Sequence, residues 1–178
     1  MTVKEFDEFV KRQQEATEVN WDRERDEWLA YLDELYSKIE TMLNGYTSSG
    51  QINIRYKTID LNEENLGSYQ TRQMILRIGR QEVDLVPKGT LFVGFKGYVD
   101  VIGSAGKSSL VLANKDRISA LPQVTVRIIE GATPRPAPTD PPVKIEWVWR
   151  ILARPPERQL IEITEESFFQ LLMEVTNG

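Results

Sequence analysis

The chain has 178 residues with a formal net charge of −5, and it contains neither cysteine nor histidine. These two absences exclude disulfides, thiol nucleophiles, thiolate zinc sites and every catalytic arrangement that relies on an imidazole. The acidic balance argues against nucleic acid as the main partner, because that binding depends on Lys and Arg side chains that neutralise phosphates.

The first 44 residues predict amphipathic helices, since they carry 12 acidic and 6 basic side chains and neither glycine nor proline. The segment is either one unbroken rod or two helices, the second of which begins at a cap supplied by Asn20. We expect it to end at Asn44-Gly45, with Gly45 in the left-handed conformation. Apolar residues recur at helical spacing: Phe6, Phe9 and Val10 on one face, then Trp21, Trp28, Leu35 and Met42 at intervals of seven, beside Leu32 and Ile39.

From residue 51 onward the apolar residues alternate, which predicts β-strands separated by glycine and proline. Tight turns are expected at Gly79-Arg80 and in the stretch "SAGK", residues 104–107. The expected strands are 51–59, 72–78, 81–86, 90–95, 97–103, 108–113, 123–130, 143–152 and 158–163. A last helix follows Thr164, its predicted N-cap, and its apolar face consists of Phe168, Leu171, Leu172 and Val175.

This order of elements predicts an α+β protein, with N-terminal acidic amphipathic helices, a central antiparallel sheet or small barrel, and a short C-terminal helix. We expect two parts, an N-terminal helical segment over residues 1–45 and a β-rich domain with the last helix over 46–178. The stripe of Trp21, Trp28, Leu35 and Met42 is expected to be buried, either on the chain's own sheet or against a second copy, because such side chains are costly to leave in water.

The stretch "VIGSAGKSSLVLANKD", residues 101–116, resembles a phosphate-binding loop followed by a guanine-binding motif. The loop motif G-x-x-x-x-G-K-[ST] requires glycine at position 101, which is Val101, and a helix after it. Residues 108–113 predict a strand instead, and Arg117 stands where N-K-x-D requires aspartate. We interpret the stretch as a hairpin loop in which Lys107 is an exposed charge with no anion to bind.

Two features are candidate contacts for a protein partner. Arg135, Pro138 and Pro141 have the R-x-x-P-x-x-P spacing that some peptide-binding grooves recognise, in a segment that must be extended. The alternative is a stiff loop between strands, which we favour. Trp147 and Trp149 share one face of a predicted strand, where they are either an interface anchor or, as we favour, core beneath the helices.

The carboxylates Glu82, Asp84, Asp100 and Glu146 lie on predicted strands and suggest a second class of function, a metal-dependent hydrolase of the nuclease type. A metal in this chain would be a hard cation held by carboxylates. No Asp/Glu-x-Lys pattern accompanies Asp84 or Asp100, however, and isolated carboxylates on strands are usually solvated.

The function we expect is therefore that of a non-enzymatic interaction subunit or inhibitor, with the carboxylate-metal hydrolase as the alternative. The expected partner is another protein or a second copy of the chain, and no cofactor is expected. Without a long apolar run or a basic, apolar leader we expect no membrane association, no signal peptide and a cytoplasmic location.

Overall fold

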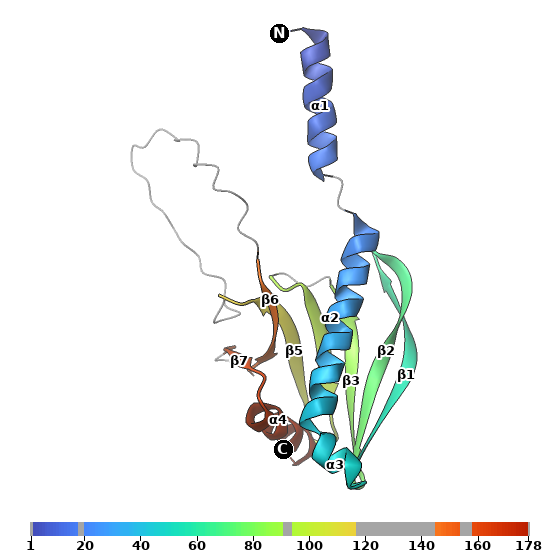
Figure 1. Ribbon diagram of the computed structural model, residues 1–178, viewed down its shortest axis with the longest axis vertical. Coiled ribbons are helices and arrows are strands. Elements are labelled where there is room, and N and C mark those ends of the chain that lie inside the picture. The colour runs from blue at the N-terminus through green and yellow to red at the C-terminus, as the bar shows by residue number, and fades with distance from the viewer. Residues whose placement is uncertain (1, 18–19, 91–93, 117–144, 154–157, 178) are drawn as a thin grey trace, which may run out of the picture.

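The computed structural model describes residues 2–17, 20–90, 94–116, 145–153 and 158–177 (Figure 1). Helix α1 (Val3–Thr17) and helix α2 (Trp21–Met42) precede the sheet. Asn20 between them has an extended backbone, and its Oδ1 accepts a hydrogen bond of 3.1 Å from the Arg23 amide. The predicted cap is thus confirmed, and of the two alternatives for this segment the chain forms two helices.

The predicted left-handed stop at Gly45 is wrong. The chain continues past α2 into a short helix, α3 (Asn44–Ser48), which contains Gly45. The left-handed residue is Gly50, with φ of 78°, five residues further on. The extra turn forms because Leu43 is fully buried and its carbonyl accepts hydrogen bonds from the amides of Tyr46 and Thr47.

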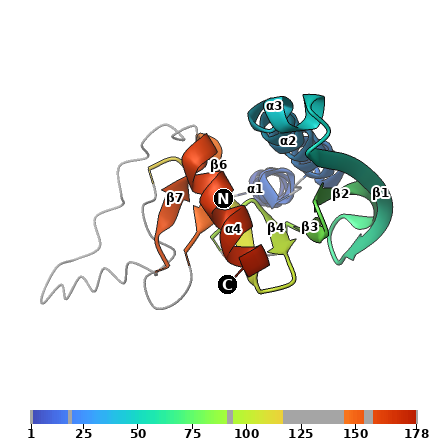
Figure 2. The ribbon, with the colours of Figure 1, turned by 90° about the horizontal axis from the view of Figure 1, so that it is seen from below.

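Within the described residues, seven strands form one antiparallel sheet whose spatial order equals their order in the sequence. They are β1 (Ile52–Glu63), β2 (Gly67–Ile78), β3 (Gln81–Gly89), β4 (Gly97–Ile102), β5 (Lys107–Asn114), β6 (Trp147–Leu152) and β7 (Leu160–Glu162). The sheet is open, with β1 and β7 at its edges, so the chain forms the predicted sheet and not a closed barrel. Figure 2 shows the strands curving around the side on which α2 and α4 (Glu165–Asn177) lie.

Both predicted hairpins are present. Ile78 pairs with Gln81 around Gly79, which has φ of 61°, and Ile102 pairs with Lys107 across the loop 103–106. The predicted strand 90–95 is wrong in its described part, because Gly94 turns the chain with φ of 88° and Phe95 forms only an isolated bridge. The predicted strand 123–130 lies outside the described residues.

The main hydrophobic core joins α2 and α4 to the concave face of the sheet (Figure 2). The predicted face of α4 is buried as expected, and Thr164 caps this helix by accepting a hydrogen bond of 3.1 Å from the Ser167 amide. The predicted division into a helical segment over residues 1–45 and a β-rich domain over 46–178 stays a prediction. The core contains residues from both parts. Helix α2 contributes Trp28, Leu32, Leu35, Tyr36 and Ile39, and α4 contributes Phe168, Leu171, Leu172 and Val175.

The predicted burial of the α2 stripe is correct except at its first member. Trp28 and Leu35 are fully buried and Met42 is partly buried, but 43% of Trp21 is exposed. Trp21 is the first residue of α2, and this end of the helix extends beyond the ends of the strands (Figure 1). The sheet therefore does not reach the side chain that the sevenfold spacing placed on the buried face.

Candidate interaction surface

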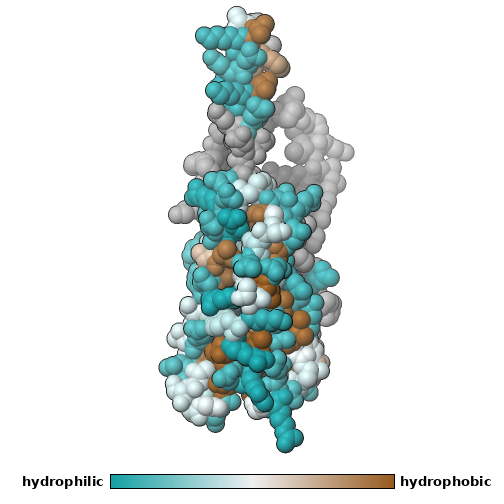
Figure 3. Space-filling view, turned by 90° about the vertical axis from the view of Figure 1, so that its right-hand side faces the viewer, coloured by the Kyte–Doolittle hydropathy of each residue, from teal (hydrophilic) through white to brown (hydrophobic). Residues whose placement is uncertain are grey.

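Helix α1 presents an apolar face that remains exposed among the residues that the structure describes. The exposed fractions of Phe6 and Phe9 are both 51%, and those of Val3 and Val10 are 80% and 39%. The two phenylalanine rings stack with their centroids 6.2 Å apart. We call α2, α3, α4 and the sheet the body. Figure 3 shows α1 standing clear of the body, with hydrophobic residues along one side and hydrophilic residues along the other. We call Val3, Phe6, Phe9 and Val10 the α1 face.

A capping box starts this helix. The Thr2 amide donates a hydrogen bond of 2.7 Å to Glu5 Oε2, and the Glu5 amide donates one of 3.4 Å to Thr2 Oγ1. This reciprocal arrangement satisfies backbone amides that have no partner in the first turn of a helix. The hydrogen bonds from Thr2 lower the pKa of Glu5, which keeps the carboxylate ionised beside the positive end of the helix.

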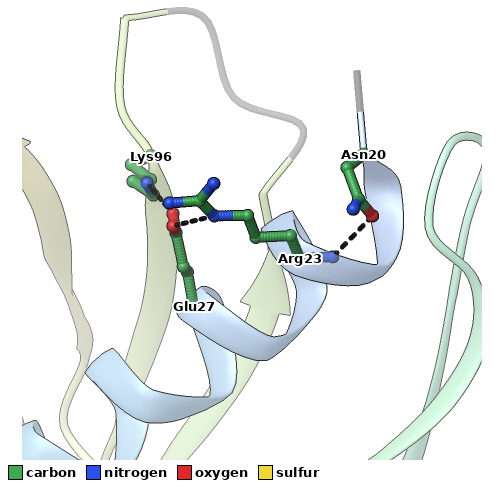
Figure 4. A network of polar contacts seen from close by, with 4 residues as sticks. All are labelled: Asn20, Arg23, Glu27 and Lys96. Atoms are coloured by element: carbon green, nitrogen blue, oxygen red, sulfur yellow. Dashed lines mark hydrogen bonds and ion pairs between the residues drawn. The ribbon is translucent and has the colours of Figure 1, made fainter. Parts of the chain in front are cut away.

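The N-terminal end of α2, which follows α1 in the chain, is fixed to the sheet by the polar network in Figure 4. Lys96 Nζ lies 2.7 Å from Glu27 Oε2, and Arg23 Nε lies 3.2 Å from Glu27 Oε1. The Lys96 ammonium also lies 5.7 Å from the ring centroids of Tyr31 and Trp147. The hydrogen bond from Lys96 holds the pKa of Glu27 below its usual value, so the Glu27 carboxylate stays ionised to a lower pH.

The two predicted tryptophan contacts lie under α2. Trp149 is buried, its ring centroid is 6.0 Å from that of Trp28, and its Nε1 donates a hydrogen bond of 2.9 Å to the Tyr31 carbonyl. Trp147 lies on the same face of β6 as Trp149. It is partly buried and packs against the edge of the core. Trp149 thus acts as core and has little surface for a partner. Arg135, Pro138 and Pro141 lie outside the described residues, so the predicted contact there stays a prediction.

The loop that resembles a phosphate-binding site holds the end of α4 instead. The Ala105 amide donates a hydrogen bond of 2.8 Å to the Val175 carbonyl, and Ser104 Oγ donates one of 3.3 Å to the Thr176 carbonyl. The last carbonyls of a helix have no hydrogen-bond donor within the helix, so the loop supplies donors to the C-terminal end of α4. Residues 107–114 form β5, so no helix begins behind Lys107, which confirms that the geometry of a phosphate loop is absent here.

Lys107 has an anionic partner, contrary to the expectation from the sequence. Its Nζ lies 3.1 Å from Asp100 Oδ2 on the neighbouring strand, and Lys88 Nζ lies 3.8 Å from the same oxygen. Asp100 is only 2% exposed, whereas the Lys107 side chain is 56% exposed. The hydrogen bond to Asp100 raises the pKa of Lys107. The pair joins diagonal positions of β4 and β5, because Asp100 pairs directly with Ser109.

The four strand carboxylates do not form one site. Glu82 pairs with Arg55 at 3.2 Å, and Glu146 pairs with Lys115 at 3.3 Å. Burial raises the pKa of Asp84, which lies on the same sheet face as Asp100. Within the described ranges, no three acidic side chains are arranged to hold a metal ion.

A buried carboxylate that the sequence did not single out lies at the far end of β1. Glu63 accepts hydrogen bonds from the Thr90 amide at 2.6 Å, from Thr90 Oγ1 at 2.8 Å, and from the Tyr69 hydroxyl. The Tyr69 hydroxyl in turn accepts a hydrogen bond of 3.0 Å from Trp28 Nε1. Burial, followed by the hydrogen bond to Glu63, raises the pKa of Tyr69. Because Glu63 lies within the polar run "NEEN", residues 62–65, no local pattern distinguishes it from a solvated residue.

The chain is thus an α+β protein, and its described part is built on an open antiparallel sheet of seven strands in sequential order. No protein-family model, curated protein or solved structure matches it. None of the helices in the described part of the chain has the length and apolar character needed to cross a membrane.

Proposed function

We propose that the protein is a non-enzymatic interaction subunit and that the α1 face is its binding surface. The exposure of this face carries the proposal. The core cluster of the described residues contains side chains from α2, α4 and the strands, and none from α1. The body therefore does not need α1 to complete its core, and the apolar side chains of α1 are available to another polypeptide.

The marginal stability of short helices supports this role. An isolated helix of the length of α1, 15 residues, is only marginally stable in water, and most helices in proteins depend on packing of an apolar face. Interfaces are enriched in aromatic side chains, Phe among them, and have a polar rim. Phe6 and Phe9, on a helix whose other sides are charged, have this character.

The hydrolase alternative receives less support. Two lysines already compensate the charge of Asp100, and Glu82 and Glu146 each have a basic partner elsewhere. A carboxylate that binds a catalytic cation must face it together with other ligands, and the described acidic side chains are dispersed.

Photo-crosslinking in the host cells tests the proposal. A photoreactive amino acid replaces Phe9 in the full chain and, as a matched control, Met173, an exposed apolar residue of α4 that is 57% accessible. We expect a covalent adduct with a polypeptide from position 9, its loss when Phe6→Ser is added, and none from position 173. Equal yields from the two positions, or no adduct from position 9, would overturn the proposal.

A further inference from the structure

The charges beside the α1 face indicate which polypeptide covers it. The apolar positions fit a heptad in which Phe6 occupies position a, Phe9 position d, and Val3 and Val10 position e. The two g positions are then Glu5 near the N-terminus and Arg12 one heptad later. The residues that flank the apolar seam thus have opposite charges at its two ends.

This distribution distinguishes the two ways in which a second copy can pair with α1. In a parallel pair, g positions face e positions, so Glu5 faces Val10 and no ion pair forms. In an antiparallel pair, g positions face g positions, so Glu5 of each copy lies opposite Arg12 of the other. The same register places Phe6 of each copy against Phe9 of the other. Charge pairs at e and g positions set partner choice and orientation in helix pairs of this kind.

We propose that the occupant of the α1 face is α1 of a second copy, in an antiparallel pair related by a twofold axis. This inference rests on the proposed function, because it names the partner of the same surface. It agrees with the symmetry of most homodimers, in which one patch binds its own counterpart. The two bodies lie at opposite ends of the pair, about 22 Å of helix apart, because each is attached at the C-terminal end of its α1.

The charge of α1 does not favour a lipid surface as the occupant. Residues 3–17 carry four acidic side chains and three basic ones. Helices that lie on anionic membranes have a polar face rich in Lys and Arg, so that the lipid charge adds to the apolar attraction. A second copy, in contrast, uses both signs of charge.

Analytical ultracentrifugation of the full chain, from low micromolar to near-millimolar concentration, tests this inference. We expect a reversible monomer–dimer equilibrium that Phe6→Ser with Phe9→Ser abolishes and Met173→Ser leaves unchanged. Since α1 contributes no side chain to the core cluster of the described residues, the variants should keep the unfolding midpoint of the body, and an unchanged midpoint would show that they remain folded. A chain that is monomeric throughout, or a dimer that survives the double substitution, would show that the inference is wrong.

Charge reversal tests the orientation separately. Arg12→Glu alone and Glu5→Lys alone each place like charges opposite one another, and each should weaken homodimerisation by about tenfold. A mixture of the two variants should form heterodimers of near-native affinity, because both contacts then join opposite charges. The mixture also controls for the role of Glu5 in the capping box, which Glu5→Lys disrupts in either setting. Singles that bind normally, or a mixture without rescue, would exclude the antiparallel pair.

The two proposals fail in different ways. A monomeric chain whose position 9 still crosslinks to another protein would overturn the homodimer and leave the proposed function intact. A monomeric chain that binds vesicles of anionic phospholipid through Phe6 and Phe9, and forms no adduct with a polypeptide, would overturn both.

Discussion

Replacing Gly103 by alanine tests whether the close contact between the β4–β5 loop and α4 stabilises the protein. A Cβ atom at Gly103 would lie 2.2 Å from the Val175 carbonyl oxygen and 2.7 Å from its carbonyl carbon. Both are backbone atoms of the last turn of α4, so no side-chain rotation relieves the contact. The helix end must move away from the loop.

The expected loss of stability follows from what this movement breaks. It removes the hydrogen bond of 2.8 Å from the Ala105 amide to Val175 and loosens Val175, which is fully buried. Overpacking of this kind costs about 1–3 kcal/mol and a lost hydrogen bond costs about 1 kcal/mol, so we expect Gly103→Ala to lower the free energy of unfolding by about 2–4 kcal/mol. For a chain of this size, each kcal/mol lowers Tm by about 2–4 °C.

Urea and thermal unfolding, followed by circular dichroism, measure this change. Gly45→Ala is the matched control, because a Cβ at Gly45 meets no atom within 4 Å and the residue lies in a helix. Alanine there should leave stability unchanged or raise it by up to about 1 kcal/mol. If Gly103→Ala were as stable as Gly45→Ala, close packing of the loop against α4 would not require glycine at position 103.

Four further predictions follow from the same structure. Trp28→Ala should lower the free energy of unfolding by about 3–5 kcal/mol in urea titrations, because the side chain is fully buried; a loss below 1 kcal/mol would contradict its place in the core. Lys107→Ala should destabilise the chain less when Asp100→Asn is already present, and a double-mutant cycle without coupling would show that the pair contributes nothing. The lowered pKa of Glu27 stabilises the folded chain at pH values above the usual pKa of 4.5, and this contribution should disappear as the pH falls through the lowered pKa. The difference in stability between the unmodified chain and Glu27→Gln should therefore shrink in acid. A difference that does not change with pH would refute the ion pair with Lys96. Magnesium with ATP or GTP should leave Tm unchanged, whereas a ligand at a hundred times its dissociation constant would add about 2.7 kcal/mol.

Much of the local structure could be predicted from the sequence because it depends on neighbouring residues. Helices and strands have different periods, so the change from one to the other near residue 50 is visible in the pattern of apolar residues. Caps and turns are also local. Asn20 and Thr164 each accept a hydrogen bond from an amide three residues ahead, and Gly79 adopts the positive φ that its hairpin requires.

The candidate site could be predicted only in part. The sequence places Phe6, Phe9 and Val10 on one helical face, and the same spacing places Trp21 and Trp28 on another. Periodicity does not indicate that Trp28 is buried while Phe6, Phe9 and Trp21 stay exposed. That difference depends on how far the sheet extends along the helices, and the extent of the sheet is set by strand pairing elsewhere in the chain.

The sequence by itself determined the type and order of most elements and the apolar faces of the helices, but not the short helix α3 or the full length of β2. Tertiary structure decided which faces pack together and which stay exposed. It also placed Lys107 beside Asp100 and Gly103 against the last turn of α4. These contacts join residues far apart in the chain: the hydrogen bond from Trp28 to Tyr69 spans 41 residues, and that from Trp149 to Tyr31 spans 118. A period reports only which side of an element is apolar, whereas a contact of this kind depends on the register of every strand between its two residues.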